Sequence, residues 1–325
     1  MNSYSQEKDS IILYNGQVLI GAVQAANLGS ISIDDMDMKI INIKLYKLRI
    51  LKIKKPFKIE TVDKKIFYGT LNTSSKDGWI DIITGDGIKT SIPITDIFGL
   101  ISLEKGFFKR LYGNVSAGLS FTKSSTIGQV NFSANVMFAS KSFNYQLSVS
   151  SIGSIDSSSY SRDNENTVLV TTYEFTNTWF LAAAGQYQRN LELSIARRWL
   201  GMLGIGNKLF IKKNWRLLGT TGITFSQEKS TADVSSGILF EIPFMFQFNF
   251  YQFHHPDIQI SSTQTTYVSL SQSGRVRWDG NTNFSWQLIR YFYLNINPYT
   301  NYDSKPPGDG STFDYGIVVG ISYKF

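Results

Sequence analysis

The strongest constraint on this chain is a strict alternation of apolar and polar residues that begins near residue 110 and recurs to the C-terminus. From Leu111 to Phe121 every odd position is apolar or small, whereas the intervening positions include Asn114, Ser116 and Ser120. Successive side chains of a β-strand point to opposite faces, so a period of two predicts strands with one apolar and one polar face. No run approaches the ~18 apolar residues of a membrane-spanning helix. The pattern therefore predicts an all-β chain.

The alternation after residue 110 also indicates the environment of these strands. Their apolar face is almost free of charge, and their polar face carries Asn, Gln, Ser, Arg and Asp. This is the pattern of a transmembrane barrel with lipid outside and a polar lumen, because only a closed sheet satisfies every backbone group in a bilayer. We predict a transmembrane antiparallel β-barrel of about 12 strands over residues 106–325. The predicted strands are 110–122, 127–139, 142–154, 164–175, 178–189, 193–208, 213–226, 232–251, 257–271, 274–288, 291–303 and 313–325, with outer loops at Ile152–Asn164 and Asp303–Thr312.

Aromatic residues supply 14% of the chain, although its mean hydropathy is only −0.11. Many lie near predicted strand ends, where an interfacial girdle would place them. The last three residues, Tyr323-Lys324-Phe325, end an alternating strand. This terminus resembles the final strand of bacterial outer-membrane proteins, and the resemblance implies that Tyr323 and Phe325 form the signal read by the barrel-assembly machinery.

Residues 11–105 differ from the rest, being rich in Ile and Lys, and they contain a loose repeat. Ile11–Gly21 is similar to Phe57–Gly69, and each copy continues with short strands. Two SH3-like repeats, at about 11–54 and 57–104, are therefore predicted to form a small β-module. Because an even number of strands leaves both barrel ends on one side, the module is predicted to lie in the periplasm.

Residues 1–10 precede this module. They lack the basic and apolar regions of a complete signal peptide. We interpret them as an N-terminal tail or the remnant of a signal peptide.

A basic stretch runs through the module, from Lys39 to Lys65, with ten basic residues against two acidic ones. One interpretation is a face for an anionic partner, either lipid headgroups or an acidic protein surface. The other is a solvated strand face. The candidate partner-binding residues are Lys44, Lys47, Arg49, Lys52, Lys54 and Lys55.

Nine charged residues fall on the polar face of the predicted barrel. They could line a selective pore or a substrate-binding lumen. Alternatively, they form ion pairs that plug a narrow barrel and stabilise it. The candidate lumen charges are Glu174, Arg216, Glu241, Arg275, Arg277, Asp279, Asp303, Asp314 and Lys324.

The sequence offers no catalytic constellation. It has no Cys, which excludes thiolate chemistry and zinc-cysteine sites. Its two histidines, His254 and His255, are adjacent, so on a strand they point apart and cannot easily share a metal. The basic residues are spread out, which argues against nucleic-acid binding. We predict a protein that is not an enzyme and uses no cofactor.

One resemblance sharpens the prediction. Tyr302–Pro307, followed by Asp314–Gly316 and a closing strand to Phe325, resembles the C-terminal signature of a bacterial family of unknown function whose members are labelled salt-induced outer-membrane proteins. The strand Gly113–Phe121 is similar as well. The resemblance covers about residues 107–325 and implies an outer-membrane barrel with no assigned chemistry.

Two functions remain open, ahead of a third alternative, an outer-membrane enzyme. In the first, the protein is a structural or accessory subunit that docks another envelope protein through its periplasmic module. In the second, it is a narrow channel for small solutes or ions. Both interpretations place it in the bacterial outer membrane, with lipid and the barrel-assembly machinery as partners.

Overall fold

The computed structural model describes residues 8–35, 37–103, 110–122, 127–156, 159–191, 195–253, 256–289, 292–305 and 312–323. Within these ranges the regular structure is β-strand, with two short 3₁₀ helices. All strand pairs are antiparallel and fall into two sheets, one of nine strands and one of twelve. Among these residues, no helix is long and apolar enough to cross a membrane. The all-β prediction is confirmed.

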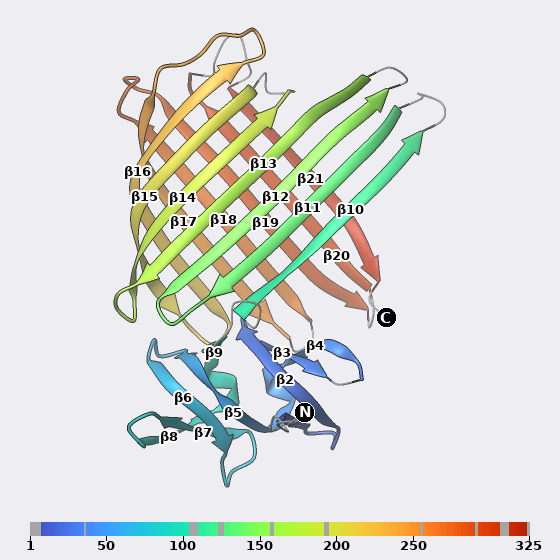
Figure 1. Cartoon of the computed structure of the whole chain (residues 1–325), viewed down its shortest axis with the longest axis vertical. Helices are drawn as coiled ribbons and strands as arrows, with labels where there is room; N and C mark the ends of the chain where they lie inside the picture. Colours follow the sequence, from blue (N-terminus) through green and yellow to red (C-terminus); the bar gives the residue numbers. More distant parts are fainter. Residues whose placement is uncertain are drawn as a thin grey trace, which may run out of the picture.

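The smaller sheet contains the strands of the N-terminal part, which we call the module (Figure 1). Their order across the sheet is β4-β3-β2-β1-β5-β6-β7-β8, and β9 pairs with both β2 and β5. The 3₁₀ helices η1 and η2 follow β4 and β8, so the two halves repeat one order of elements. The two halves share a single sheet, in which β9 pairs with one strand of each half. The strands are β1 (Asp9–Leu13), β2 (Val18–Asn27), β3 (Ser30–Asp35), β4 (Lys39–Lys44), β5 (Leu48–Thr61), β6 (Ile66–Thr73), β7 (Trp79–Thr84), β8 (Lys89–Pro93) and β9 (Ile97–Ser102); η1 is Leu45–Lys47 and η2 is Ile94–Asp96.

The module has its own hydrophobic core. Alternate residues of neighbouring strands, such as Ile31 and Ile33 of β3, are completely buried. The long strand β5 contributes Leu51 and Ile53. All the buried residues of this core lie between Ile11 and Leu100, so none comes from the larger sheet. Burial of apolar surface within the module therefore stabilises it independently of its neighbour.

Two glycines allow close contact between strands of the module. A Cβ at Gly21 would lie 2.1 Å from the carbonyl oxygen of Asp34, and one at Gly69 would lie 2.0 Å from that of Ile83. We expect Gly21→Ala to destabilise the module by about 1–3 kcal/mol, because backbone atoms must move apart. Amide hydrogen exchange of the module strands measures this loss. Gly85→Ala is the control, since a Cβ there has no atom within 4 Å; equal effects of the two substitutions would contradict the prediction.

The larger sheet is a meander in which each strand pairs with the next along the chain (Figure 1). Strict alternation and short connections produce such consecutive antiparallel hairpins. Its twelve strands lie close to the predicted stretches. They are β10 (Leu111–Thr122), β11 (Ile127–Ala139), β12 (Phe143–Asp156), β13 (Ser159–Glu174), β14 (Trp179–Asn190), β15 (Ile195–Ile211), β16 (Trp215–Ser230), β17 (Leu239–Gln252), β18 (Ile258–Ser269), β19 (Val276–Ile289), β20 (Phe292–Asp303) and β21 (Phe313–Tyr323).

Two details of the predicted strands differ from the structure. The outer loop expected at Ile152–Asn164 is mostly strand, because β12 continues to Asp156 and pairs with the start of β13, as in Ile155↔Tyr160. Runs of serine in this region carry no hydrophobic period, so the sequence did not reveal these extensions. Conversely, residues 232–238 precede β17 and are not part of it.

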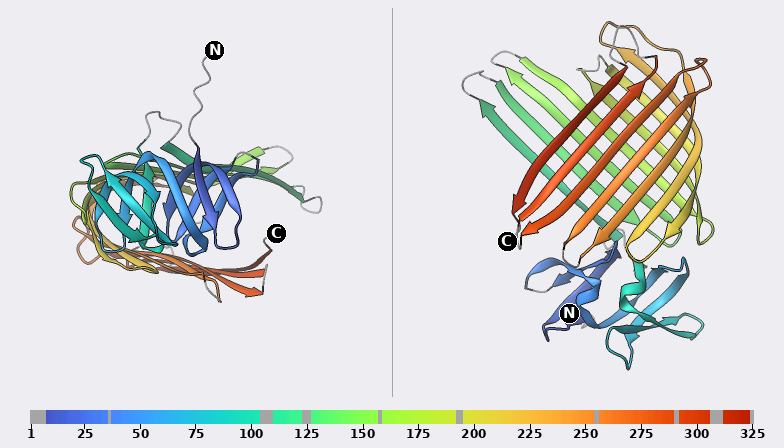
Figure 2. Two further views of the ribbon diagram at one scale, coloured as in Figure 1. Left: turned by 90° about the horizontal axis from the view of Figure 1, so that it is seen from below. Right: turned by 180° about the vertical axis from the view of Figure 1, so that it is seen from behind.

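The larger sheet curves into two facing walls, and its edge strands β10 and β21 lie on the same open side (Figure 2). Each of these strands pairs with one neighbour among the described residues, and no pairing joins them to each other. The structure thus shows the predicted twelve-stranded antiparallel sheet without the predicted closure. Of the candidate terminal signal, Tyr323 ends β21 at this edge, whereas Phe325 and the side chain of Tyr323 lie outside the described residues.

The two faces of the larger sheet are inverted relative to a protein that folds in water. On β16, Ile223 and Phe225 are 53% and 49% exposed, whereas Thr224 and Ser226 are 1% and 3% exposed. The same arrangement recurs around the sheet. Exposed large apolar side chains include Leu169, Leu181, Trp199, Leu203, Phe240, Phe244, Phe246, Ile317 and Ile321.

Candidate functional site

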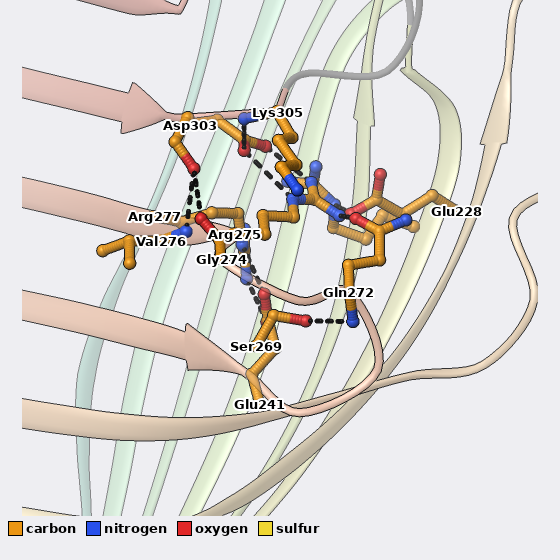
Figure 3. A network of polar contacts seen from close by, with 12 residues as sticks. Glu228, Glu241, Ser269, Gln272, Gly274, Arg275, Val276, Arg277, Asp303 and Lys305 are labelled. Atoms are coloured by element: carbon orange, nitrogen blue, oxygen red, sulfur yellow. Dashed lines mark hydrogen bonds and ion pairs between the residues drawn. The ribbon is translucent and has the colours of Figure 1, made fainter.

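Charged side chains gather on the inner face of the larger sheet (Figure 3), at the end where β17 and β19 begin, which lies away from the module (Figure 1). Arg277 of β19 reaches across β18 to Glu241 of β17, with Nε–Oε1 and Nη2–Oε2 distances of 2.9 and 2.5 Å. The ring of Tyr267 lies 4.5 Å from the Arg277 guanidinium group. Both members of the ion pair are buried. Two parallel hydrogen bonds fix the orientation of the guanidinium group relative to the carboxylate and strengthen the ion pair.

A second ion pair lies at the start of β19. Arg275 donates from Nε and Nη2 to the carboxylate of Asp303, at 3.0 and 2.5 Å, and from Nη1 to Gln272 at 3.1 Å. The backbone N–H of Lys305 also donates to Asp303, at 3.0 Å. This network ties the β18–β19 turn to the end of β20.

A third ion pair joins β15 and β16, where Arg198 Nε donates to the Glu228 carboxylate at 2.9 Å. A cavity of about 490 Å³ opens at this end of the sheet. Two of the charges that border it, Glu228 and Arg275, are held in these ion pairs, whereas Lys305 Nζ donates to the carbonyl oxygen of Ser273 at 2.5 Å. The cavity is lined by Glu228, Ser236, Leu239, Gln272, Ser273, Arg275 and Lys305.

Of the remaining candidate lumen charges, some lie within the described residues and others do not. Asp279 lies on β19 two residues beyond Arg277, and therefore on the same face of that strand. Asp314 lies in β21, but its side chain is outside the described residues, as is the whole of Lys324. His254 and His255 are also outside them. Within the described part of the chain, no group of three His, Cys, Asp or Glu residues could hold a metal ion.

Glu174 and Arg216 lie at the opposite end of the sheet, next to the module. Glu174 forms an ion pair with Lys58 of β5, and Lys208 of β15 joins it at 3.4 Å. Lys208 also lies 2.8 Å from Glu60 of the module. Arg216 donates to Asn249 at 3.0 Å, and its guanidinium group lies 5.5 Å from the Phe98 ring. Sequence reasoning did not identify Lys58, Glu60 or Lys208, because nothing in the sequence indicated where the two sheets meet.

Some candidate residues of the basic stretch form ion pairs, and others are exposed. Lys44 forms an ion pair with buried Asp257 of the larger sheet, and its Nζ lies 4.5 Å above the Phe253 ring. Arg49 lies 3.9 Å from Asp77 within the module. Lys47, Lys52 and Lys54 are exposed, and Lys55 is half-buried. Lys44 is therefore committed to a contact with the larger sheet, and Arg49 to one within the module.

Tyr46 lies beside Lys44 at this contact. Its hydroxyl donates to the carbonyl oxygen of Phe253 at 3.4 Å. Burial, with a smaller effect of the Asp257 carboxylate, raises the pKa of Tyr46 above its usual value. The phenol therefore stays a neutral hydrogen-bond donor at this junction.

The fold and these clusters define a class: antiparallel β-meander proteins whose large sheet exposes apolar side chains and encloses ion pairs. Within that class, this chain belongs to the family described as protein of unknown function, DUF481, whose model matches residues 115–325. The match covers most of β10 and all later strands, and it leaves out the module. No curated protein matches the chain.

Proposed function

We propose that this protein is an integral protein of a bacterial outer membrane that serves as a structural or accessory subunit. The observation that carries the proposal is the inverted sheet, on which Ile223 and Phe225 are exposed while Thr224 and Ser226 are buried. Large apolar patches facing water are unfavourable and rare. A sheet with an apolar outside and a polar inside suits a bilayer.

The proposal includes closure of the large sheet by pairing of β10 with β21. A strand edge in lipid leaves N–H and C=O groups without partners, and each unsatisfied group costs several kcal/mol. The strands are 11–17 residues long, enough to cross the apolar band of an outer membrane when tilted. We also propose that the two halves of the module are related SH3-like units, as their repeated order of strands and 3₁₀ helix suggests.

The accessory role is supported by the module, which projects beyond the end of the large sheet (Figure 1). Its exposed side chains Lys47, Lys52 and Lys54 form a basic surface. Such a surface attracts an acidic envelope partner or anionic headgroups. A second candidate function, a narrow channel for ions or small solutes, is favoured by the polar inner face of the sheet.

The test is heat-dependent gel mobility of the full chain refolded in lipid vesicles. Membrane barrels keep their closed form in the gel unless boiled, so we expect the unboiled sample to migrate differently from the boiled one. Identical migration would contradict the barrel. Single-channel recording on the same sample then separates the two functions: steady ohmic steps favour the channel, and their absence favours the accessory role.

A further inference from the structure

The module lies across one end of the large sheet and spans the space between its two walls (Figure 2). Its contacts reach four consecutive hairpins at that end, which connect β11 to β12, β13 to β14, β15 to β16 and β17 to β18. The contacting residues of the large sheet are Lys141, Glu174, Lys208, Leu209, Arg216, Phe253 and Asp257.

The central contact is a chain of four alternating charges: Lys58, Glu174, Lys208 and Glu60. The outer two belong to the module and the inner two to the large sheet, so each sheet supplies one cation and one anion. All four side chains are at most 15% exposed. Ion pairs removed from water in this way are strong only when every member is matched.

A second contact joins the module to the connection between β17 and β18. Lys44 pairs with Asp257, and Tyr46 bonds to the backbone of Phe253. Nearby, Gly29 has a φ of +74°, and a Cβ there would lie 2.3 Å from the Tyr251 ring. The backbone of the module thus rests directly on an aromatic side chain of the large sheet.

The two ion-paired contacts are polar, and the aromatic rings beside them, Phe98, Tyr251 and Phe253, do not belong to the core of the module. All core residues of the module lie within the module itself, so loss of the ion pairs leaves it folded. Interfaces between domains that depend on charge separate more readily than apolar ones, and salt weakens them where they are reached by water.

We infer that the module is a reversible cap, held by these two ion-paired contacts, which closes one end of the interior of the large sheet to solutes. The interior is reached from this side only when Lys58–Glu174–Lys208–Glu60 and Lys44–Asp257 separate. This inference rests on the proposed function, because an enclosed interior requires the sheet to close.

The test measures access to Thr220, which lies on β16 on the same strand face as Arg216, four residues away. The chain has no Cys, so Thr220→Cys gives a single thiol. Its reaction rate with a charged, water-soluble maleimide is measured on the full chain in detergent micelles. Addition of Lys44→Glu and Lys208→Glu is expected to raise the rate about tenfold or more. Lys76→Glu with Lys229→Glu, which makes the same charge change away from both contacts, is expected to leave it unchanged.

Salt provides a second measurement that needs no ion-pair variant. Raising the ionic strength from about 0.05 M to about 1 M should speed labelling of the Thr220→Cys chain, because the charges enter water when the contacts separate, and counterions screen them there. It should have little effect once Lys44 and Lys208 are replaced. Equal rates in all variants and at both salt concentrations would overturn the cap, even where the gel assay supports the barrel. Identical migration of boiled and unboiled samples in that assay would overturn the barrel, and the cap with it.

Discussion

Replacing Arg277 with methionine is expected to lower the free energy of unfolding of the large sheet by about 3–5 kcal/mol. The substitution leaves the Glu241 carboxylate, which is 1% exposed, without its bidentate partner. A buried charge without a partner is costly because burial removes its hydration and nothing replaces it. The loss is measured by urea unfolding of the full chain folded in detergent micelles.

Two variants control this prediction. Arg162→Met also removes an ion pair, with Glu165, but Arg162 is 51% exposed, so we expect a loss of about 1 kcal/mol or less. Arg277→Met combined with Glu241→Leu removes both buried charges and should recover most of the stability, since apolar residues of similar volume often replace a buried pair without loss. A loss for Arg277→Met no greater than that for Arg162→Met would contradict the role assigned to this pair.

The strand period identified these charges but not their partners. The alternation of apolar and polar residues along β17 and β19 places Glu241 and Arg277 on the polar face. Which carboxylate each arginine meets depends on the register of the strands. The pairing Arg277↔Tyr267 and Tyr267↔Pro243 brings Glu241 within reach across β18, and a one-residue slip of either ladder would have broken it.

The contact between the two sheets could not be predicted for a different reason. Lys58 alternates with Phe57 and Ile59 in a basic stretch, and this pattern predicts a solvated or partner-binding face. In the structure all three residues are buried, because β5 is covered on one side by the core of the module and on the other by the large sheet. Alternation reports which side chains are polar, but it does not reveal that the polar side is covered as well.

Leu203→Arg is expected to lower the yield of folded chain in lipid vesicles. Leu203 is 65% exposed and lies in β15, on the face that the proposed function places against lipid. An arginine near the centre of a bilayer costs about 2–4 kcal/mol on the lipid face of a barrel, which lowers the folding equilibrium on the order of 30-fold or more. The measurement is the fraction of vesicle-refolded protein that shows the heat-dependent shift in gel mobility.

The matched control for this last prediction is Val234→Arg. Val234 is 68% exposed, so the two substitutions place the same charge at equally accessible apolar positions. Val234 lies in the connection between β16 and β17, outside the strands, where an arginine remains in water. The two variants should differ in folded yield only if the large sheet faces lipid. In water both would be harmless, so equal yields in vesicles would show that the apolar face of the sheet does not contact the bilayer.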